Sequence, residues 1–565
     1  MIRVPVIVAA ILLAACTAQP SSTRMNAPSD GTAAPAASMV DQNRTLVIAV
    51  RSEATSLASK PLVGTAFNVT PTEIFNAGLA VKDEKGVARP YLIEALPLLN
   101  TDTWRVSPDG RMETTQRLKP DVVWQDGEPL TANDFIFAWQ LYAIPELGVA
   151  NTSPITEVAE VLAPDARTIV IRWKRPFPDA ATLEGRDFQP LPRHILEAPL
   201  RDLSPEAFSA HPFWSTEYIG LGPYRLDRTE PGAFLEAAAF DRYVLGRPKI
   251  SRIRVSYISD PNTVLANLLA GTVHVALSNA LPFQQSTVLK REWAGRAAGG
   301  VQPSASISSP IRRTETQLHP ERVAPGSRPL LDVRVRKALA HTVDKQALND
   351  GVFDGEGVMA DTPVPYPLDY FQLVDQAITK YPFDVRRAEQ LMNEAGLSKG
   401  PDGFYTGPLG RFTPGINVIA GPQNESGMAI MANTWRNAGF DFTESVLPAA
   451  QARDNGFRVL FPSMASTDGG VIEMLGASGM PTADNRWNGN NRASWINPEF
   501  ETLLDGWNTT LDQTARIQRM VGMAKVYSDD LPSTPVWYVL NVTAYTADVR
   551  GPHHEADEIH LWEFR

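Results

Sequence analysis

Hydrophobic and polar positions interchange along this chain in short blocks that favour a mixed α/β fold. Thr45–Val50 is a nearly continuous apolar run, which indicates a buried strand and the start of the folded body. Ile253–Tyr257 alternates apolar and polar residues, as does a strand with one buried face. Strand-like and helix-like blocks continue to interchange up to the C-terminus. The pattern therefore predicts mixed α/β domains and not a repeat array.

Apolar residues at helical spacing predict five amphipathic helices. They run from Thr131, from Asp260 to Gly271, from Asp332 to Asp344, from Asp384 to Gly396 and from Asp512 to Asp529. Thr131 and Asp134 have the spacing of a capping box, and Gly396 is placed to end a helix. The faces expected to be buried are Phe135, Ala138, Trp139 and Tyr142; Val264, Leu265, Leu268 and Leu269; Val335, Ala338, Leu339, Thr342 and Val343; Ala388, Leu391, Met392 and Ala395; and Ile517, Met520, Val521 and Ala524. Trp104 and Trp124, in blocks that turn sharply, are expected in the core.

The N-terminus has one positive charge, Arg3, and then a short apolar run, Val6–Ala15. This run is too short for a helix to cross ~30 Å of hydrocarbon, and it ends in small residues, which is the layout of a secretory signal. The only cysteine of the chain, Cys16, follows it. Leu13-Ala14-Ala15-Cys16 resembles the bacterial lipoprotein box, in which the cysteine takes a diacylglycerol. The alternative is an ordinary buried cysteine. We expect residues 1–15 to be a signal peptide and Cys16 to be the lipid attachment site.

Residues 16–44 are expected to form a flexible tether. From Thr17 to about Asn43 the chain is almost entirely Ala, Ser, Pro, Thr and Gly. Such a stretch cannot bury enough apolar area to offset the entropy of ordering it. With Cys16 committed to lipid, no disulfide is possible, so packing alone stabilises the folded body.

Overall charge excludes one class of partner. Lys plus Arg is 52 and Asp plus Glu is 63, which gives a net charge of −11. Nucleic acid needs a basic surface, so we expect no nucleic-acid binding. A hydrophobic content of 43% and a charged content of 20% are typical of a globular protein. No later segment is apolar for long enough to span a membrane.

Gly220-Leu221-Gly222-Pro223-Tyr224 contains a Gly-x-Gly pattern, which occurs in the phosphate-binding loops of nucleotide-binding proteins. Pro223 has no backbone N–H, and neither a Lys-Ser/Thr pair nor another helix-opening glycine follows. We therefore reject a phosphate-binding loop. We expect Gly220 and Gly222 to let the chain turn sharply where it passes between domains.

Several blocks, in order across residues 45–550, resemble the family 5 extracellular solute-binding proteins of ABC importers, which include dipeptide- and oligopeptide-binding lipoproteins. The most specific block, Trp124–Trp139, resembles the family's Trp-x-Asp-Gly-x-Pro-hydrophobic-Thr-Ala-x-Asp signature. The other blocks are Gly220–Tyr224, similar to Gly-Thr-Gly-Pro-Tyr; Asp332–Leu339, similar to Asp-x-Arg-Val-Arg-x-Ala-Leu; Tyr381–Asp384 with Ala388; Asn497–Phe500; and Pro532–Val539.

This resemblance implies a type II periplasmic-binding-protein fold, with two hinged lobes that close on a ligand and an extra inserted domain. Lobe I is expected from residues 45–70, 215–305 and 530–565. The inserted domain II is expected from 71–214, and lobe III from 306–529. Gly220 and Gly222 would then lie at one hinge.

The resemblance also suggests ligand-binding residues. Peptide-binding members hold the ligand's ammonium group with an Asp in a Trp-x-Ala-Asp-Tyr-like segment after a strand. The corresponding stretch here has Met464 in place of the tryptophan and Asp468 shifted by about one residue. Asp468 is the candidate amine-binding carboxylate, or else a turn residue beside two glycines. Glu53, Trp487 and Asn491 are further candidates for the ligand cleft, or else ordinary surface residues.

The sequence has no Gly-x-Ser-x-Gly elbow and no His-Glu-x-x-His zinc motif. His553, His554 and His560 lie close together near the C-terminus, where we expect a solvated tail and not a metal site. We therefore expect no catalytic residues, no metal and no cofactor.

The sequence predicts an exported, lipid-anchored receptor, on the outer face of the cell membrane or in the periplasm. As a monomer, it would capture a small solute, which we expect to be a peptide, and deliver it to the permease of an ABC transporter. Two alternatives stay open: a receptor of the same family for a sugar, an opine or a metal chelate, and a secreted hydrolase. Thr17 after Cys16 leaves the choice between inner and outer membrane undecided.

Overall fold

The computed structural model describes residues 45–62, 73–82, 87–150, 152–277, 280–305, 309–448, 451, 454–485 and 487–551. The predicted signal peptide, Cys16 and the tether lie outside these described residues. So do His553, His554 and His560.

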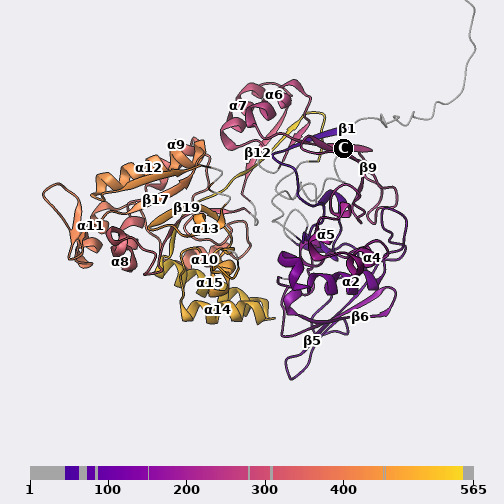
Figure 1. The fold of residues 1–565 in the computed structure, drawn as a ribbon. Helices are drawn as coiled ribbons and strands as arrows, with labels where there is room; N and C mark the ends of the chain where they lie inside the picture. Colours follow the sequence, from indigo (N-terminus) through magenta and orange to yellow (C-terminus); the bar gives the residue numbers. More distant parts are fainter. Residues whose placement is uncertain are drawn as a thin grey trace, which may run out of the picture. The chain divides into compact units, whose positions relative to one another are not determined.

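A mixed sheet of seven strands forms the first part of the described fold (Figure 1), in the order β12-β21-β11-β1-β10-β9-β8. β1 runs parallel to β10 and β11, and the other pairs are antiparallel. Two helices, α6 and α7, share a hydrophobic cluster with β11 and β21. The elements are β1 (Thr45–Val50), β8 (Tyr224–Glu230), β9 (Phe234–Ala239), β10 (Arg252–Tyr257), α6 (Pro261–Ala270), β11 (Val275–Ala276), α7 (Phe283–Trp293), β12 (Gly299–Ser304) and β21 (Asn541–Thr546).

The insertion between β1 and β8 contains a four-stranded sheet, β4-β5-β7-β6, and the two-stranded β2-β3, again among the described residues. Its elements are β2 (Ala80–Lys82), β3 (Ala88–Pro90), β4 (Trp104–Val106), β5 (Met112–Arg117), α2 (Ala132–Tyr142), β6 (Val158–Asp165), β7 (Thr168–Trp173), α3 (Gly185–Phe188), α4 (Arg193–Asp202) and α5 (Pro205–Ser209). Trp104 and Trp124 are buried, as predicted. One continuous core joins this insertion to the seven-stranded sheet, so the two are packed as a unit and not tethered.

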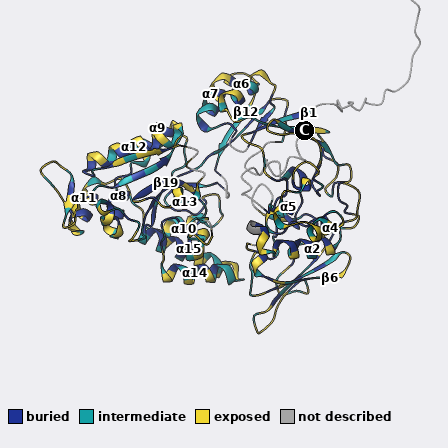
Figure 2. Ribbon diagram, viewed as in Figure 1, coloured by how far each residue is buried: buried dark blue, intermediate teal, exposed yellow. Residues whose placement is uncertain are grey.

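Residues 309–538 build the remaining part around a sheet with the order β18-β17-β19-β13-β20. α12 packs against α9 and β17, with its buried face toward the sheet (Figure 2). The elements are β13 (Ile311–Thr316), α8 (Val333–Ala340), α9 (Lys345–Phe353), α10 (Phe371–Ala377), α11 (Val385–Glu394), β14 (Ser398–Lys399), β15 (Tyr405–Gly407), β16 (Gly410–Arg411), β17 (Gly415–Ile419), α12 (Pro422–Ala438), β18 (Thr443–Leu447), α13 (Asn455–Val459), β19 (Met464–Gly469), α14 (Pro498–Thr509), α15 (Gln513–Asp530) and β20 (Ser533–Tyr538). Short 3-10 segments lie at Pro145–Ala150, Ile155–Glu157, Pro212–Trp214, Pro325–Leu331, Ile472–Leu475 and Ala477–Gly479.

All five predicted helices are present, but the one expected from Asp332 to Asp344 is too long: α8 ends at Ala340, and Asp344 caps the start of α9. Thr131 and Asp134 form a reciprocal capping box at the start of α2. Asp260, Asp332, Asp384 and Asp512 each accept a backbone hydrogen bond at the start of α6, α8, α11 and α15. The predicted burial of Leu269 is wrong. Its side chain is 46% exposed, because only the face of α6 that carries Val264 and Leu268 is fully buried.

The chain joins the seven- and five-stranded sheets twice, from β12 to β13 and from β20 to β21. The two connections are linked where Val539 N–H donates to the Pro310 carbonyl at 2.9 Å. We expected the return to lobe I at residue 530, which is too early because β20 pairs with β13. Periodicity identifies β20 as a strand but does not determine which sheet it joins.

Lys60 is a buried cation in the core shared by the insertion and the seven-stranded sheet. It is 5% exposed, and Nζ donates to the Arg186 carbonyl at 3.4 Å. Burial lowers the pKa of Lys60 to about 8, although the negative charge of Asp187 acts to raise it. The unfolded chain therefore binds more protons than the folded one between about pH 8 and the ordinary lysine pKa of about 10.4, so stability rises with pH in this window.

We predict that the free energy of unfolding rises by about 2 kcal/mol from pH 7.5 to 9.5 because of Lys60. Lys60→Met should remove this rise, as measured by denaturant unfolding at both pH values. Lys525→Met is the matched control, because Lys525 lies at the surface with its side chain 56% exposed. A rise of unchanged size in Lys60→Met would assign the effect to other groups.

Candidate functional site

A cavity with a volume of about 370 Å³ lies in the seven-stranded sheet part. Glu53 follows β1 and Tyr257 ends β10, and both line the cavity. Because β1 and β10 are parallel, their carboxyl ends lie at one edge of the sheet, which is where ligands bind in open α/β sheets. Ser215 and Thr216 approach the cavity from the end of the insertion.

Glu53 is the carboxylate of this cavity lining. One oxygen, Oε2, accepts a hydrogen bond from Gly232 N–H at 2.8 Å, and the residue is exposed. Burial raises the pKa of Tyr257, and the nearby charge of Glu53 raises it further. The other polar side-chain groups of the lining are hydroxyls, on Thr55, Ser215, Thr216, Thr229 and Tyr257. The lining can therefore pair with one cationic group and form hydrogen bonds to uncharged ones.

Asp468 lies on β19, in the five-stranded sheet, and its side chain is 42% exposed. Both oxygens face Arg312 of β13: Nη2 donates to Oδ2 at 2.9 Å, and Nε lies 2.8 Å from Oδ1. The Arg312 side chain is 6% exposed and its guanidinium lies over the Trp537 ring. The charge of Asp468 is thus already balanced by a protein cation, which weakens its pull on a ligand ammonium group.

β13 is a strand of mostly polar residues in which all six are buried, Ile311–Thr316. Arg313 and Glu315 form an ion pair at 3.0 Å, with side chains 1% and 2% exposed. Arg313 also donates to the carbonyls of Gly470 and Asn490, both at 3.0 Å. This one guanidinium therefore ties β13 to the segments that follow β19 and precede α14.

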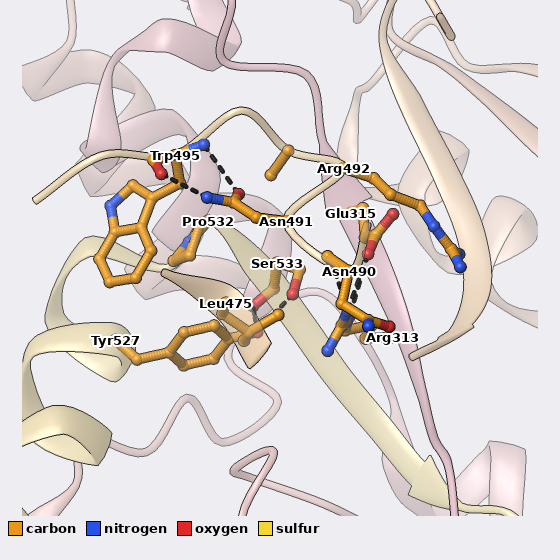
Figure 3. Close-up of a pocket in the computed structure, with 11 residues that line it drawn as sticks. Arg313, Glu315, Leu475, Asn490, Asn491, Arg492, Trp495, Tyr527, Pro532 and Ser533 are labelled. Carbon is orange, nitrogen blue, oxygen red and sulfur yellow. Dashed lines mark hydrogen bonds and ion pairs between the residues drawn. The ribbon is translucent and has the colours of Figure 1, made fainter. Parts of the chain in front are cut away.

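Trp487 and Asn491 belong to one loop, between Thr482 and Asn497. Trp487 has a positive φ of 60° and its ring faces the guanidinium of Arg322. Asn491 is 2% exposed; its Nδ2 donates to the Trp495 carbonyl at 2.6 Å and its Oδ1 accepts from Trp495 N–H at 3.0 Å. Figure 3 shows these bonds beside Arg313 and Glu315. Asn491 thus shapes the loop, whereas Trp487 is half-buried at its surface.

Gly220 and Gly222 lie against the backbone of the insertion. Gly222 N–H donates to the Phe75 carbonyl at 2.8 Å, and a Cβ at Gly220 would lie 1.9 Å from that same oxygen. Gln125 holds the segment from the other side, through bonds to Gly220 and Gly222. Close backbone packing is therefore the structural requirement for both glycines.

The predicted site residues thus fall into two groups. Glu53 lines the cavity of the seven-stranded sheet part, while Asp468, Trp487 and Asn491 belong to the five-stranded sheet part. In the part of the chain that the structure describes, no three His, Cys, Asp or Glu side chains converge as metal ligands. None of the described helices has the length and apolar character needed to cross a bilayer.

The two mixed sheets, the double crossing between them and the cavity at parallel strand ends define a periplasmic-binding-protein fold, as predicted. The family of "Bacterial extracellular solute-binding proteins, family 5" matches residues 94–497 with its middle-region model. The chain belongs to this family. Its members bind solutes outside the cytoplasm and are not enzymes, which agrees with the predicted class of protein.

The similar proteins have low sequence identity to this chain. Proteins of Brucella species, including Brucella ovis, that carry the name "Putative ABC transporter peptide-binding protein" are 26% identical over 297 residues, or 53% of this chain and 51% of theirs. The match thus spans about half the length of these relatives. Longer matches are the oligopeptide-binding protein OppA of Bacillus subtilis, 24% identical over 84% of this chain and 87% of that protein, and the Escherichia coli dipeptide-binding protein, 22% identical over 87% and 90%.

Solved structures share the fold. NikZ of Campylobacter jejuni, in complex with Ni(L-His), has a TM-score of 0.74 at 20% identity, covering 92% of this chain and 99% of its own. An oligopeptide-binding protein of Thermus thermophilus with a pentapeptide has a TM-score of 0.73 at 20% identity, covering 92% and 96%. One fold therefore accommodates a metal chelate and a peptide, and the likeness shows the fold alone.

The sequence did not identify several residues that lie close to the predicted ligand-binding residues. Arg312 and Arg313 lie in a stretch that has no apolar alternation, so periodicity does not predict a central strand there. Tyr257 was identified as a strand residue but not as part of a cavity. A signal was present in one case: Arg312-Arg313 with Glu315 places three charges in four residues, an arrangement that in a globular chain calls for partners.

Proposed function

We propose that this protein is an extracytoplasmic receptor that binds a peptide and delivers it to an ABC transporter permease. The observation that carries the proposal is the cavity at the carboxyl ends of β1 and β10, with Glu53 in its lining, in a chain of the family 5 class. A peptide has an ammonium group for the carboxylate and backbone groups for the hydroxyls. The peptide-binding names of the longer matches support the same ligand class.

In this proposal lobe closure is driven by binding, because a ligand that contacts both sheets does so only in the closed state. Lobe I comprises 45–70, 215–305 and the chain after β20; domain II is 71–214; and lobe III is the region around the five-stranded sheet. Cys16 attaches the chain to the membrane by lipid, and the tether of residues 16–44 raises the local concentration of receptor at its permease. Acyl labelling can check this attachment.

The test is titration of the purified protein with a peptide library, read by thermal shift, beside an assay for turnover. A ligand at 100 times its Kd adds about 2.7 kcal/mol of stability. Saturable stabilisation without product supports a receptor. Product formation that disappears with one carboxylate substitution would instead support the hydrolase alternative. Stabilisation by a sugar or a metal chelate, and not by any peptide, would show that the ligand is not a peptide.

We predict that Glu53→Gln weakens binding of a peptide with a free amine by about tenfold and leaves its N-acetylated form unaffected, because the lost attraction is between charges. Asp468→Asn is the matched variant, with the same change from carboxylate to amide. It should have the smaller effect, since Arg312 already balances Asp468. Calorimetric titration of both peptides measures the contrast. The reverse order of effects would assign the amine to Asp468.

A further inference from the structure

Two ion pairs join the insertion to the five-stranded sheet part. Arg516, near the start of α15, donates from Nη1 and Nη2 to the two carboxylate oxygens of Asp179, at 2.8 and 2.7 Å. Arg175, which follows β7, donates from Nη1 to Asp505 Oδ1 of α14 at 2.7 Å. Each part thus supplies one cation and one anion. The two charge patterns are therefore complementary when the parts meet in this one placement.

An apolar residue extends the contact. Leu511, in the turn between α14 and α15, is half-buried and packs against the hydrophobic core that the insertion shares with the seven-stranded sheet. A residue of the five-stranded sheet part therefore excludes water beside the ion pairs. Charges attract more strongly where water is excluded. We call Arg175, Asp179, Asp505, Leu511 and Arg516 together the clasp.

Each arginine of the clasp is positioned by groups of its own part. Arg516 donates from Nε to the Trp507 carbonyl at 3.0 Å, and its guanidinium lies over the Trp507 ring, 4.1 Å from the centroid. Arg175 donates from Nε to Glu157 Oε2 at 2.8 Å. Both cations are thus preorganised, so forming the pairs across the two parts orders little more than the aspartate side chains.

The two ion pairs differ in strength. The Arg516 side chain is 17% exposed and binds Asp179 through two parallel hydrogen bonds, the arrangement in which an arginine–carboxylate pair is strongest. The Asp505 side chain is 70% exposed and forms one hydrogen bond to Arg175. An exposed ion pair of this second kind contributes little. Most of the stabilisation by charge in the clasp therefore comes from Arg516 and Asp179.

Arg516 also has a carboxylate near it within its own part. The Oε2 atom of Glu473 is buried and has no hydrogen-bond partner among the described residues. Burial raises the pKa of Glu473, the charge of Arg516 lowers it, and the charge of Asp179 raises it. Asp179 and Glu473 therefore compete for one guanidinium. Contact between the parts favours Asp179, and separation leaves Arg516 with Glu473, so the contact is reversible.

We infer that the clasp holds the two lobes together around a bound ligand and slows its release. This inference rests on the proposed function for lobe closure around a ligand. None of the five clasp residues lines the 370 Å³ cavity, so the clasp acts on the lobes and not on the ligand. Ligand and clasp both favour the closed arrangement. Breaking the clasp therefore shifts the population toward the open arrangement and speeds dissociation.

The experiment measures the dissociation rate of trialanine by stopped-flow tryptophan fluorescence. Asp179→Asn should raise this rate about tenfold, because it removes hydrogen bonds to a charged group. The double variant Asp179→Arg with Arg516→Asp restores the pair in reverse and should restore most of the slow release. Asp441→Asn is the matched control, since Asp441 pairs with Arg411 inside the five-stranded sheet part and should leave the rate unchanged. Equal rates in the two carboxylate variants would overturn the clasp.

Glu473→Gln makes the same chemical change and should act in the opposite direction. Without the Glu473 carboxylate, Arg516 has no anion in the open arrangement, so opening becomes less favourable and trialanine should leave more slowly than from the wild type. Release accelerated as much as in Asp179→Asn would overturn the clasp, because the two carboxylates would then not compete for Arg516.

Small-angle X-ray scattering without peptide separates the clasp from the peptide proposal. At low salt the wild type should have a smaller radius of gyration than Asp179→Asn, and the difference should disappear at about 0.5 M salt, which screens exposed charges. This result together with no binding of trialanine would keep the clasp while the peptide proposal fails. Equal radii of the two proteins at low salt would overturn the clasp, whether or not trialanine binds.

Discussion

Glu315→Gln is expected to lower the free energy of unfolding by about 3–5 kcal/mol, as for the loss of one partner from a buried ion pair. The side chains of Arg313 and Glu315 are 1% and 2% exposed, so water cannot replace the lost charge. Arg313 would keep its bonds to Gly470 and Asn490 but lose its counter-ion. Denaturant unfolding at neutral pH measures the loss.

The matched control for this variant is Glu356→Gln. Glu356 pairs with Lys290 at 2.9 Å, but both side chains are 51% exposed, so the change should stay within about 1 kcal/mol. Equal effects of the two substitutions would mean that the Arg313–Glu315 pair contributes little net stability.

The difference between β13 and the correctly predicted helices shows how much of the fold could be predicted from the sequence. Helices such as α6 and α11 were predictable because capping and apolar spacing act locally and are written in consecutive residues. β13 was not, because its buried Arg313 depends on backbone carbonyls far along the chain and the strand depends on neighbouring strands on both sides. Periodicity detects burial by apolar side chains and does not detect burial of polar ones that have partners.

The candidate site shows the same limit. Glu53 could be singled out because it follows the first strand, and the structure places it in the lining of the 370 Å³ cavity. The surroundings of Asp468 could not be foreseen, because its partner Arg312 lies on another strand. Asp179 and Arg516 resemble any surface charges in sequence. They become notable only when folding pairs them across the two parts.

Gly220→Ala is expected to destabilise the protein by about 3 kcal/mol, because the new methyl group would overlap backbone atoms. The added Cβ would lie 1.9 Å from the Phe75 carbonyl oxygen and 3.0 Å from its carbon, and neither atom can rotate away as a side chain would. Relief requires the segment to move off Phe75, which would stretch its two bonds to Gln125. Unfolding by denaturant, with and without bound peptide, measures the effect.

Gly506→Ala provides the comparison. Gly506 lies inside α14, and an added Cβ would meet only the flexible side chain of Arg519, at 3.1 Å. Alanine there should stabilise the helix by about 0.5–1 kcal/mol. The pair also separates the two accounts of Gly220: close packing lowers stability by the same amount with and without ligand, whereas a hinge would change ligand affinity at little cost to the unliganded fold. A large shift in affinity at unchanged stability would support the hinge, since a residue that adjusts its backbone during closure would respond in that way.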